Sequence, residues 1–499
     1  MEQFERLRER LGAIADLEAA QAVLSWDQET YMPAGGGEAR AAQLATLGRI
    51  GHEMLTDDAV GILLDGAGAE VAGLDPGSDA ARIVAVTRRD FEKAVRVPAS
   101  LVAELASATA LAQQAWAQAR ATNDFASFQP HLERVLGLTM QKAEALGYDE
   151  TPYDALLDEY EPDMKAAEVK AVFAHLRAEL VPLVEAIAEQ PQPHDSCLRR
   201  QFDGASQWAF GEAVIRDFGF DFNRGRQDRS AHPFSTNFAT SDVRITTRVD
   251  EEFLPSALFG TLHEAGHAMY EQGADPGLDR TRLANGTSLG IHESQSRLWE
   301  NLVGRSPAFW GHYYPRLQKR FTDQLGSVDL ADFYRAINRV EPSLIRVEAD
   351  EVTYNLHVMI RFELELELVT GRLAVADLPA AWNARYEEML GLTPPSDADG
   401  VLQDIHWSFG LIGYFPTYTL GNLVSVQLFE QAAADLGDLD EQIGRGEFGA
   451  LREWLRANVH RHGRKFSALE LLRRITGGGL DAEPWLRYAR TKFGGLYGV

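Results

Sequence analysis

The chain has a single cysteine, Cys197, among 499 residues, so it cannot form an internal disulfide. Basic residues are also scarce, because 48 Lys and Arg stand against 74 Asp and Glu, for a formal net charge of −26. A field of this sign repels phosphate backbones and anionic membranes. No stretch reaches the roughly 18 uninterrupted apolar residues of a membrane span. The N-terminus mixes charges with apolar residues and leaves no signal-peptide core. We therefore expect a cytoplasmic protein that binds neither nucleic acid nor membrane.

Apolar residues spaced three and four apart dominate the sequence. The first segment places Phe4, Leu7, Leu11, Ile14 and Leu17 on one helical face. Residues 99–123 form an Ala- and Leu-rich run without an interior breaker, and residues 165–190 form another, which Pro182 should kink or interrupt. Strand signals gather only between residues 218 and 249, in FGFDF and DVRITTRV. The pattern predicts a mainly α fold with one small sheet.

The best candidate for a linker is QPQPHDS, which ends at Ser196. It separates an N-terminal helical region, residues 1–196, from a region that holds the chemistry-bearing motifs, residues 197–499. We expect the two regions to pack as one continuous structural unit. A chain of this length can bury about three quarters of its unfolded surface, which is enough to enclose a dry cleft.

The strongest chemical signal is His263-Glu264-Ala265-Gly266-His267, within a helical pattern. Residues four apart lie on one face of a helix, so two imidazoles can meet one metal ion with Glu264 beside it. Chance would give about 0.03 such patterns in a chain of this composition. Two buried histidines without a metal are the alternative interpretation. The spacing itself is typical of zinc-assisted hydrolysis.

A catalytic zinc usually takes three protein ligands and keeps one position open. The next helical pattern, IHESQSRLWENLVG, offers Glu293 and, two turns later on the same face, Glu300. The residues alone leave both open. In this interpretation the metal polarises the scissile carbonyl and activates water, while Glu264 accepts the water proton and passes it to the leaving amine.

Two further groups are needed, a donor for the developing oxyanion and a cation for a substrate carboxylate. The aromatic stretch near position 410 offers His406, Tyr414 and Tyr418 as donors. Arginines near the other motifs can grip a carboxylate with both nitrogens. These arginines are Arg244, Arg248 and Arg346.

The metal motif does not distinguish carboxypeptidases from other peptidases. An HExxH oligopeptidase or aminopeptidase therefore stays open. A helical binding scaffold with a purely structural metal site is a candidate from another class, although a structural site would be expected to close its fourth position with another Cys or His.

The ordered motifs resemble those of the carboxypeptidase Taq family of metallocarboxypeptidases over most of the chain. In chain order they are SWDQETYMP at 25–33, His232-Pro233-Phe234, Asp242 with Arg244 and Thr246, HEAGH at 263–267, His292-Glu293-Ser294-Gln295, IRVEAD at 345–350, and Gly400 with Gln403, Asp404, His406 and Trp407. No catalytic position departs from the family pattern.

The resemblance implies zinc, or cobalt in its place, held by His263, His267 and Glu293, with Glu264 as general base. It also implies a homodimer, an elongated helical fold with a long groove and the small sheet near the active site, and removal of residues one at a time from peptide C-termini with broad specificity. Four residues are expected to bind substrate: Asp242, Arg244, Arg346 and Gln403. His406 and Tyr414 are expected to assist the tetrahedral intermediate.

Overall fold

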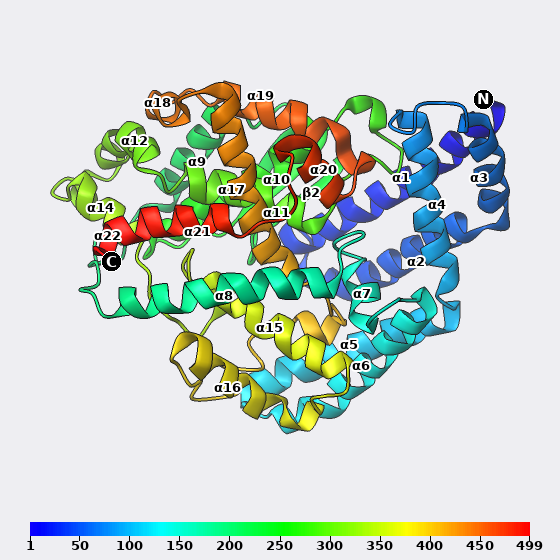
Figure 1. The fold of residues 1–499 in the computed structure, drawn as a ribbon, viewed down its shortest axis with the longest axis horizontal. Helices are drawn as coiled ribbons and strands as arrows, with labels where there is room; N and C mark the ends of the chain where they lie inside the picture. The colour runs from blue at the N-terminus through cyan, green and yellow to red at the C-terminus, as the bar shows by residue number, and fades with distance from the viewer. The chain divides into compact units, whose positions relative to one another are not determined.

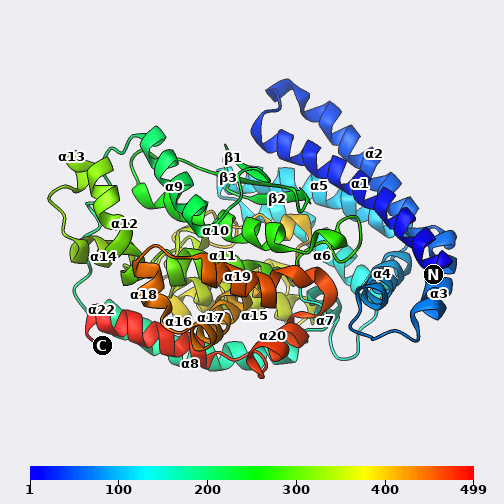
Figure 2. The same cartoon turned by 90° about the horizontal axis from the view of Figure 1, so that it is seen from above.

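The structure of the protein, a computed structural model, describes residues 1–499. The chain folds mainly into helices, with one three-stranded sheet (Figures 1 and 2). The mainly α prediction is confirmed. The chain divides into two compact units, and each combines three segments. Unit 1 comprises Met1–Val95, His194–Ile337 and Leu428–Gly477, and unit 2 comprises Arg96–Pro193, Asn338–Gln427 and Gly478–Val499. The change of unit at His194 falls inside the predicted linker, whereas the predicted region 197–499 contributes to both units.

Unit 1 holds the sheet and most of the helices. Its elements are α1 (Glu2–Thr30), α2 (Gly37–Thr56), α3 (Asp58–Val71), α4 (Asp79–Arg96), α9 (Gly204–Phe218), β1 (Gly225–Arg229), β2 (Ser235–Ala239), β3 (Asp242–Thr247), α10 (Leu254–Gly273), α11 (Leu289–Arg297), the π-helical turn η3 (Leu298–Val303), α12 (Pro307–Arg320), α13 (Thr322–Leu325), α14 (Leu330–Ile337), α18 (Leu439–Gly444), α19 (Gly449–Asn458) and α20 (Ala468–Thr476). Helix α17 (Pro416–Leu436) contains the change from unit 2 to unit 1.

Unit 2 consists of helices joined by loops and contains no strand. Its elements are α5 (Ala99–Thr122), α6 (Phe125–Leu146), α7 (Pro152–Leu157), α8 (Ala166–Ala188), the 3-10 turns η4 (Arg346–Glu348) and η6 (His406–Phe409), α15 (Tyr354–Val369), α16 (Leu378–Leu390), α21 (Glu483–Ala489) and α22 (Gly495–Tyr497). Helix α8 continues through Pro182 without interruption. The proline removes one backbone hydrogen bond, while Leu180 and Val184 on either side are buried and hold the helix in place.

The sheet lies where the sequence predicts it. The strand order is β1-β3-β2, with β1 parallel and β2 antiparallel to β3. DVRITTRV supplies β3, but FGFDF forms no strand, because α9 continues to Phe218 and Gly219 ends it with a φ of 106°. The sheet packs beside α10 (Figure 2), where Thr247 Oγ1 donates to the carbonyl of Ala257 at 3.3 Å.

The first helix packs through the face predicted for it. Phe4, Leu7, Leu11 and Ile14 are buried, and the first three belong to a core shared with α3 and α4. No single helix of the protein is both long and apolar enough to cross a membrane; only the bent pair α4 and α5, taken together, meets those criteria.

Candidate metal centre

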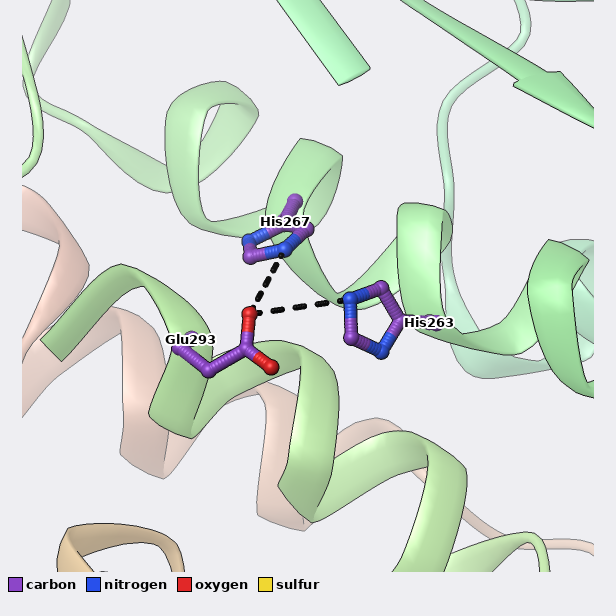
Figure 3. A group of neighbouring side chains, drawn as sticks. All are labelled: His263, His267 and Glu293. Carbon is purple, nitrogen blue, oxygen red and sulfur yellow. Dashed lines mark ion pairs between the residues drawn. The ribbon is translucent and has the colours of Figure 1, made fainter. Parts of the chain in front are cut away.

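Helix α10 carries both predicted histidine ligands in its middle turns. Pro255 lies in its first turn, where a missing N–H costs nothing, and most of the helix is buried. The ring centroids of His263 and His267 are 4.9 Å apart. Figure 3 shows the two rings on the same side of the helix, where they converge on Glu293.

Glu293 reaches the histidines from α11, the helix that follows α10. Ser288 caps this helix by accepting a hydrogen bond from the N–H of Ile291. Glu293 Oε2 lies 3.6 Å from His263 Nε2 and 3.4 Å from His267 Nε2, and one donor atom from each residue falls within 4.8 Å of the others. A tetrahedral ion with bonds of about 2.1 Å needs ligand separations of about 3.4 Å. The donor set therefore fits a zinc-sized cation.

Glu300 occupies a different place from Glu293, although both come from the same face of the predicted helical segment. It lies in η3, and its Oε2 accepts a hydrogen bond from His263 Nδ1 at 2.8 Å. It therefore binds the ring nitrogen that faces away from Glu293. A carboxylate on this nitrogen fixes the tautomer in which Nε2 carries the lone pair needed for a metal.

Arg297 joins the two carboxylates of the site. Its Nε donates to Glu293 Oε1 at 2.6 Å, and its Nη1 donates to Glu300 Oε2 at 3.3 Å. Burial raises the pKa of both carboxyls, but Arg297 and the histidines outweigh it. The pKa of Glu293 is held well below its usual range and that of Glu300 falls to about 2. Both groups are therefore ionised acceptors at neutral pH.

The two histidines differ in proton affinity. Burial lowers the pKa of His267 to about 3. Burial also acts to lower the pKa of His263, but the charges on Glu293 and Glu300 outweigh it and raise this pKa to about 8. A cation at the site competes with the His263 proton, because a ligating imidazole must be neutral.

Glu264 is almost completely buried, at 6% exposure, between the two histidines in the sequence of α10. Burial raises its pKa to about 7, against the effect of His263 and with a contribution from Glu293. A carboxylate with this proton affinity can take a proton near neutral pH and release it again.

The sequence profile of the carboxypeptidase Taq (M32) metallopeptidase family matches residues 6–493. The chain belongs to this family. It is 45% identical to thermostable carboxypeptidase 1 of Thermus thermophilus, with 99% of each chain covered, and 38% identical to carboxypeptidase 1 of Bacillus subtilis over 98% of this chain and 97% of that one. Its fold matches the crystal structure of an M32 carboxypeptidase from Deinococcus radiodurans with a TM-score of 0.98, 49% identity and full coverage of both chains. The resemblance read from the motifs is confirmed, and the protein is a metallocarboxypeptidase.

Asp242 and Arg244 of this M32 peptidase lie on β3 in unit 1. Arg244 donates through Nε and Nη2 to the two carboxylate oxygens of Asp242, each at 2.9 Å. Its guanidinium also stacks over Trp26 at 4.3 Å and Phe238 at 4.8 Å. The SWDQETYMP segment and the motif of Asp242, Arg244 and Thr246 therefore meet through this contact.

The other predicted substrate-binding residues lie in unit 2, around Arg346. This residue is 4% exposed. Its Nε and Nη2 donate to Asp404 Oδ1 at 3.0 and 2.8 Å, and its Nη1 donates to Tyr354 OH at 2.8 Å. These bonds use three of the five N–H groups of the guanidinium. Gln403 Oε1 accepts from the backbone N–H of Arg346 at 2.9 Å.

Arg361 is a second buried cation in the same cluster, and the sequence motifs did not predict it as a site residue. It donates to Asp404 Oδ2 through Nε at 2.7 Å and to Gln403 Oε1 through Nη2 at 2.8 Å. Two guanidiniums share one carboxylate, so the cluster has an excess of positive charge. An arginine within the apolar run of α15 is the signal that could have identified it, because a buried charge needs a partner.

His406 and Tyr414 lie close to this cluster in unit 2. His406 Nδ1 is 3.9 Å from Asp404 Oδ1, its Nε2 is 3.3 Å from Tyr418 OH, and its ring centroid is 5.4 Å from that of Tyr414. Burial lowers the pKa of His406 to about 4, so the ring is neutral at pH 7. Arg346, Gln403, His406 and Tyr414 are thus brought together within one unit.

Proposed function

We propose that this M32 carboxypeptidase uses zinc, held by His263, His267 and Glu293, to remove residues one at a time from peptide C-termini with broad side-chain tolerance. The observation that carries the proposal is the convergence of two Nε2 atoms on one carboxylate oxygen, at 3.6 and 3.4 Å. Cobalt has the same preference for such a site and should substitute.

Held by His263, His267 and Glu293, zinc would supply Lewis-acid polarisation of the scissile carbonyl and would lower the pKa of a bound water. Glu264 accepts the proton of the attacking water and delivers it to the leaving amine, a role supported by its raised pKa. Glu300 and Arg297 hold the ligands in orientation, since each bonds an atom of a ligand that faces away from the shared position.

The buried cluster in unit 2 is the proposed source of recognition for the substrate carboxylate. Arg346 binds it, supported by the positive excess of two guanidiniums on Asp404. Gln403 positions the Arg346 backbone, and neutral His406 with Tyr414 donates to the tetrahedral intermediate. We propose that Asp242 and Arg244 also contribute to substrate binding, as the family resemblance implies.

Chelation and reconstitution test the metal. We expect removal of the metal to abolish hydrolysis and zinc or cobalt to restore it. Hydrolysis that is indifferent to chelators would contradict the proposal.

A pair of peptides tests the direction of attack. One peptide has a blocked N-terminus and a free C-terminus, and its partner has a free N-terminus and a C-terminal amide. We expect a ladder of C-terminal truncations from the first peptide and resistance from the second. Equal cleavage of both indicates an oligopeptidase, and cleavage of the amidated peptide alone indicates an aminopeptidase.

The assembly and location of the enzyme are part of the same proposal. We propose a cytoplasmic homodimer that acts on peptides. We also propose that it binds neither nucleic acid nor membranes, because its net charge of −26 repels anionic partners. Light scattering should then give twice the chain mass of 55.2 kDa. A monomer in solution would contradict the dimer without affecting the chemistry.

A further inference from the structure

The Nδ1 atom of His263 binds the carboxylate of Glu300, whereas the Nδ1 atom of His267 faces another histidine. His267 Nδ1 lies 2.6 Å from Nδ1 of His292, on the first turn of α11. His292 Nε2 lies 2.7 Å from Glu271 Oε1, and Asn237 Nδ2 on β2 donates to Glu271 Oε2 at 2.9 Å. A chain of polar contacts therefore runs from the metal centre through α11 and back to α10 and the sheet, all within unit 1.

The direction of this chain is fixed by its far end. Glu271 is 6% exposed, and its carboxylate accepts from Asn237 on one oxygen. The other oxygen must accept from His292, so His292 Nε2 carries a proton. In a neutral ring, Nδ1 of His292 then has the lone pair, and the facing Nδ1 of His267 is the donor. This leaves the lone pair of His267 on Nε2, the atom that points to Glu293.

The packing around His292 holds its ring in this position. The ring centroid lies 5.1 Å from that of Tyr270. A Cβ on Gly286 would lie 2.6 Å from His292 Cδ2, so only glycine leaves room for the imidazole there. The ring is therefore confined between α10 and the loop before α11.

We infer that His292 and Glu271 are positioning residues, which set the tautomer of His267 and through it the affinity of the site for its metal. The inference rests on the proposed zinc site. Neither His292 nor Glu271 is a proposed metal ligand, and both act through the His267 ring. Outer partners of ligating histidines typically change metal affinity by about 10- to 100-fold.

Zinc affinity, measured by competition with a chromophoric chelator, tests this inference without using turnover. H292F keeps a ring of similar size but removes both hydrogen bonds, and we expect a loss of about 10- to 100-fold in affinity. H292N can still accept from His267 and should lose less. E271Q keeps an acceptor for His292 without the charge and should also be intermediate.

Gly286→Ala supplies an independent variant that removes no polar group, and it should weaken zinc binding because it displaces the His292 ring. His52→Phe on α2 is the matched control, and we expect its affinity to equal that of the wild type. Folding of each metal-free variant is checked by circular dichroism, and E271Q decides the question if H292F does not fold.

The outcomes separate this inference from the proposed function. If wild type and H292F bind zinc equally tightly, the positioning role is wrong although the site stands. If the wild type binds no zinc, or binds it equally well after His263→Ala, the proposed metal centre itself is wrong. An H292N affinity no better than that of H292F would show that the contact with His267 Nδ1 does not set the affinity.

Discussion

At the scale of single residues, Glu264 differs from His263 and His267 on α10 because it is not one of the proposed metal ligands. It is buried, and its pKa is raised to about 7, whereas Glu293 and Glu300 are held as carboxylates by Arg297. In the proposed mechanism the three acids of the site therefore divide into one proton carrier, one ligand and one orienting group. This division follows from the neighbours of each carboxyl, since Glu264 and Glu293 are buried and Glu300 is only 12% exposed.

Glu264→Gln should separate proton transfer from metal binding. We expect zinc content to stay at the wild-type level and kcat to fall by about 10²- to 10⁴-fold, because the amide cannot accept the proton. Exposed Glu252, just before α10, supplies the control Glu252→Gln, which should leave both unchanged. Turnover close to wild type in Glu264→Gln would remove Glu264 from the reaction.

At the scale of elements, the site depends on how closely α10 and α11 approach. A Cβ at Gly266 would lie 2.6 Å from the carbonyl oxygen of Gln295 and from Cα of Ser296 on α11. Only a residue without a side chain permits this separation, which is what allows Glu293 to reach the two histidines. The glycine inside the HEAGH motif therefore has a structural reason of its own.

Gly266→Ala should destabilise the protein by about 1–3 kcal/mol through overpacking and weaken zinc binding, because α11 must move away. Gly260→Ala on the same helix is the matched control. Its new Cβ would meet Thr247 Oγ1 at 3.4 Å, an ordinary contact, and alanine favours the helix. Equal thermal midpoints and zinc affinities for the two variants would show that the close approach of α10 and α11 does not require glycine at position 266.

A second set of elements in unit 2 is joined by Asp404, which binds Arg346 of η4 and Arg361 of α15. Burial alone would raise the pKa of this carboxyl, but the two arginines outweigh it and hold the pKa well below the ordinary value of 3.8. A pKa lowered in the folded state contributes stability above that ordinary value, and the contribution is lost as pH falls below it.

Asp404→Asn should therefore destabilise the protein by about 3–5 kcal/mol, since it leaves two buried cations without a counter-charge. The deficit in thermal midpoint should stay constant across the neutral range and shrink only as the pH falls below 3.8. Glu104→Gln, which removes an exposed partner of Arg134, should change the midpoint little. A deficit that disappears near neutral pH would show that another group is responsible.

At the scale of the whole molecule, the three proposed ligands and their polar partners all belong to unit 1, whereas the Arg346 cluster belongs to unit 2. A ligand that binds only the folded state stabilises it by mass action, by about 4 kcal/mol at a thousandfold excess over Kd. Zinc should therefore stabilise the unit that contains its ligands most directly.

Chelation should lower the thermal midpoint and accelerate amide hydrogen exchange in α10 and α11 more than in α15. Mass spectrometry of exchange with and without zinc measures the difference for each helix. Exchange that accelerates equally in both units would contradict a local effect of the metal.

The sequence predicted the parts of the site that depend on spacing along one helix or on ordered motifs. His263 and His267 fall on one face because they are four residues apart, and the small sheet follows from β-branched alternation in DVRITTRV. The choice between Glu293 and Glu300 could not be made from spacing, because both lie on one face. The close approach of α11 to α10 at Gly266 places Glu293 beside Nε2 of His263.

Contacts between segments that are distant along the chain could not be predicted from the sequence either. The division of the chain into two units, each made of three separate segments, depends on packing among segments up to hundreds of residues apart, which no local pattern encodes. The contacts of Arg361 with Asp404 and of His292 with His267 are of the same kind. The residue types could be flagged, but their partners could not be named.

The number of zinc ions bound per chain in the wild type, Glu293→Ala and Glu300→Gln shows which carboxylate is the third ligand. By equilibrium dialysis at a zinc concentration that saturates the wild type, we expect one ion per chain in the wild type and in Glu300→Gln, and none in Glu293→Ala. Binding of one ion by Glu293→Ala with wild-type affinity would contradict the assignment of Glu293 as that ligand.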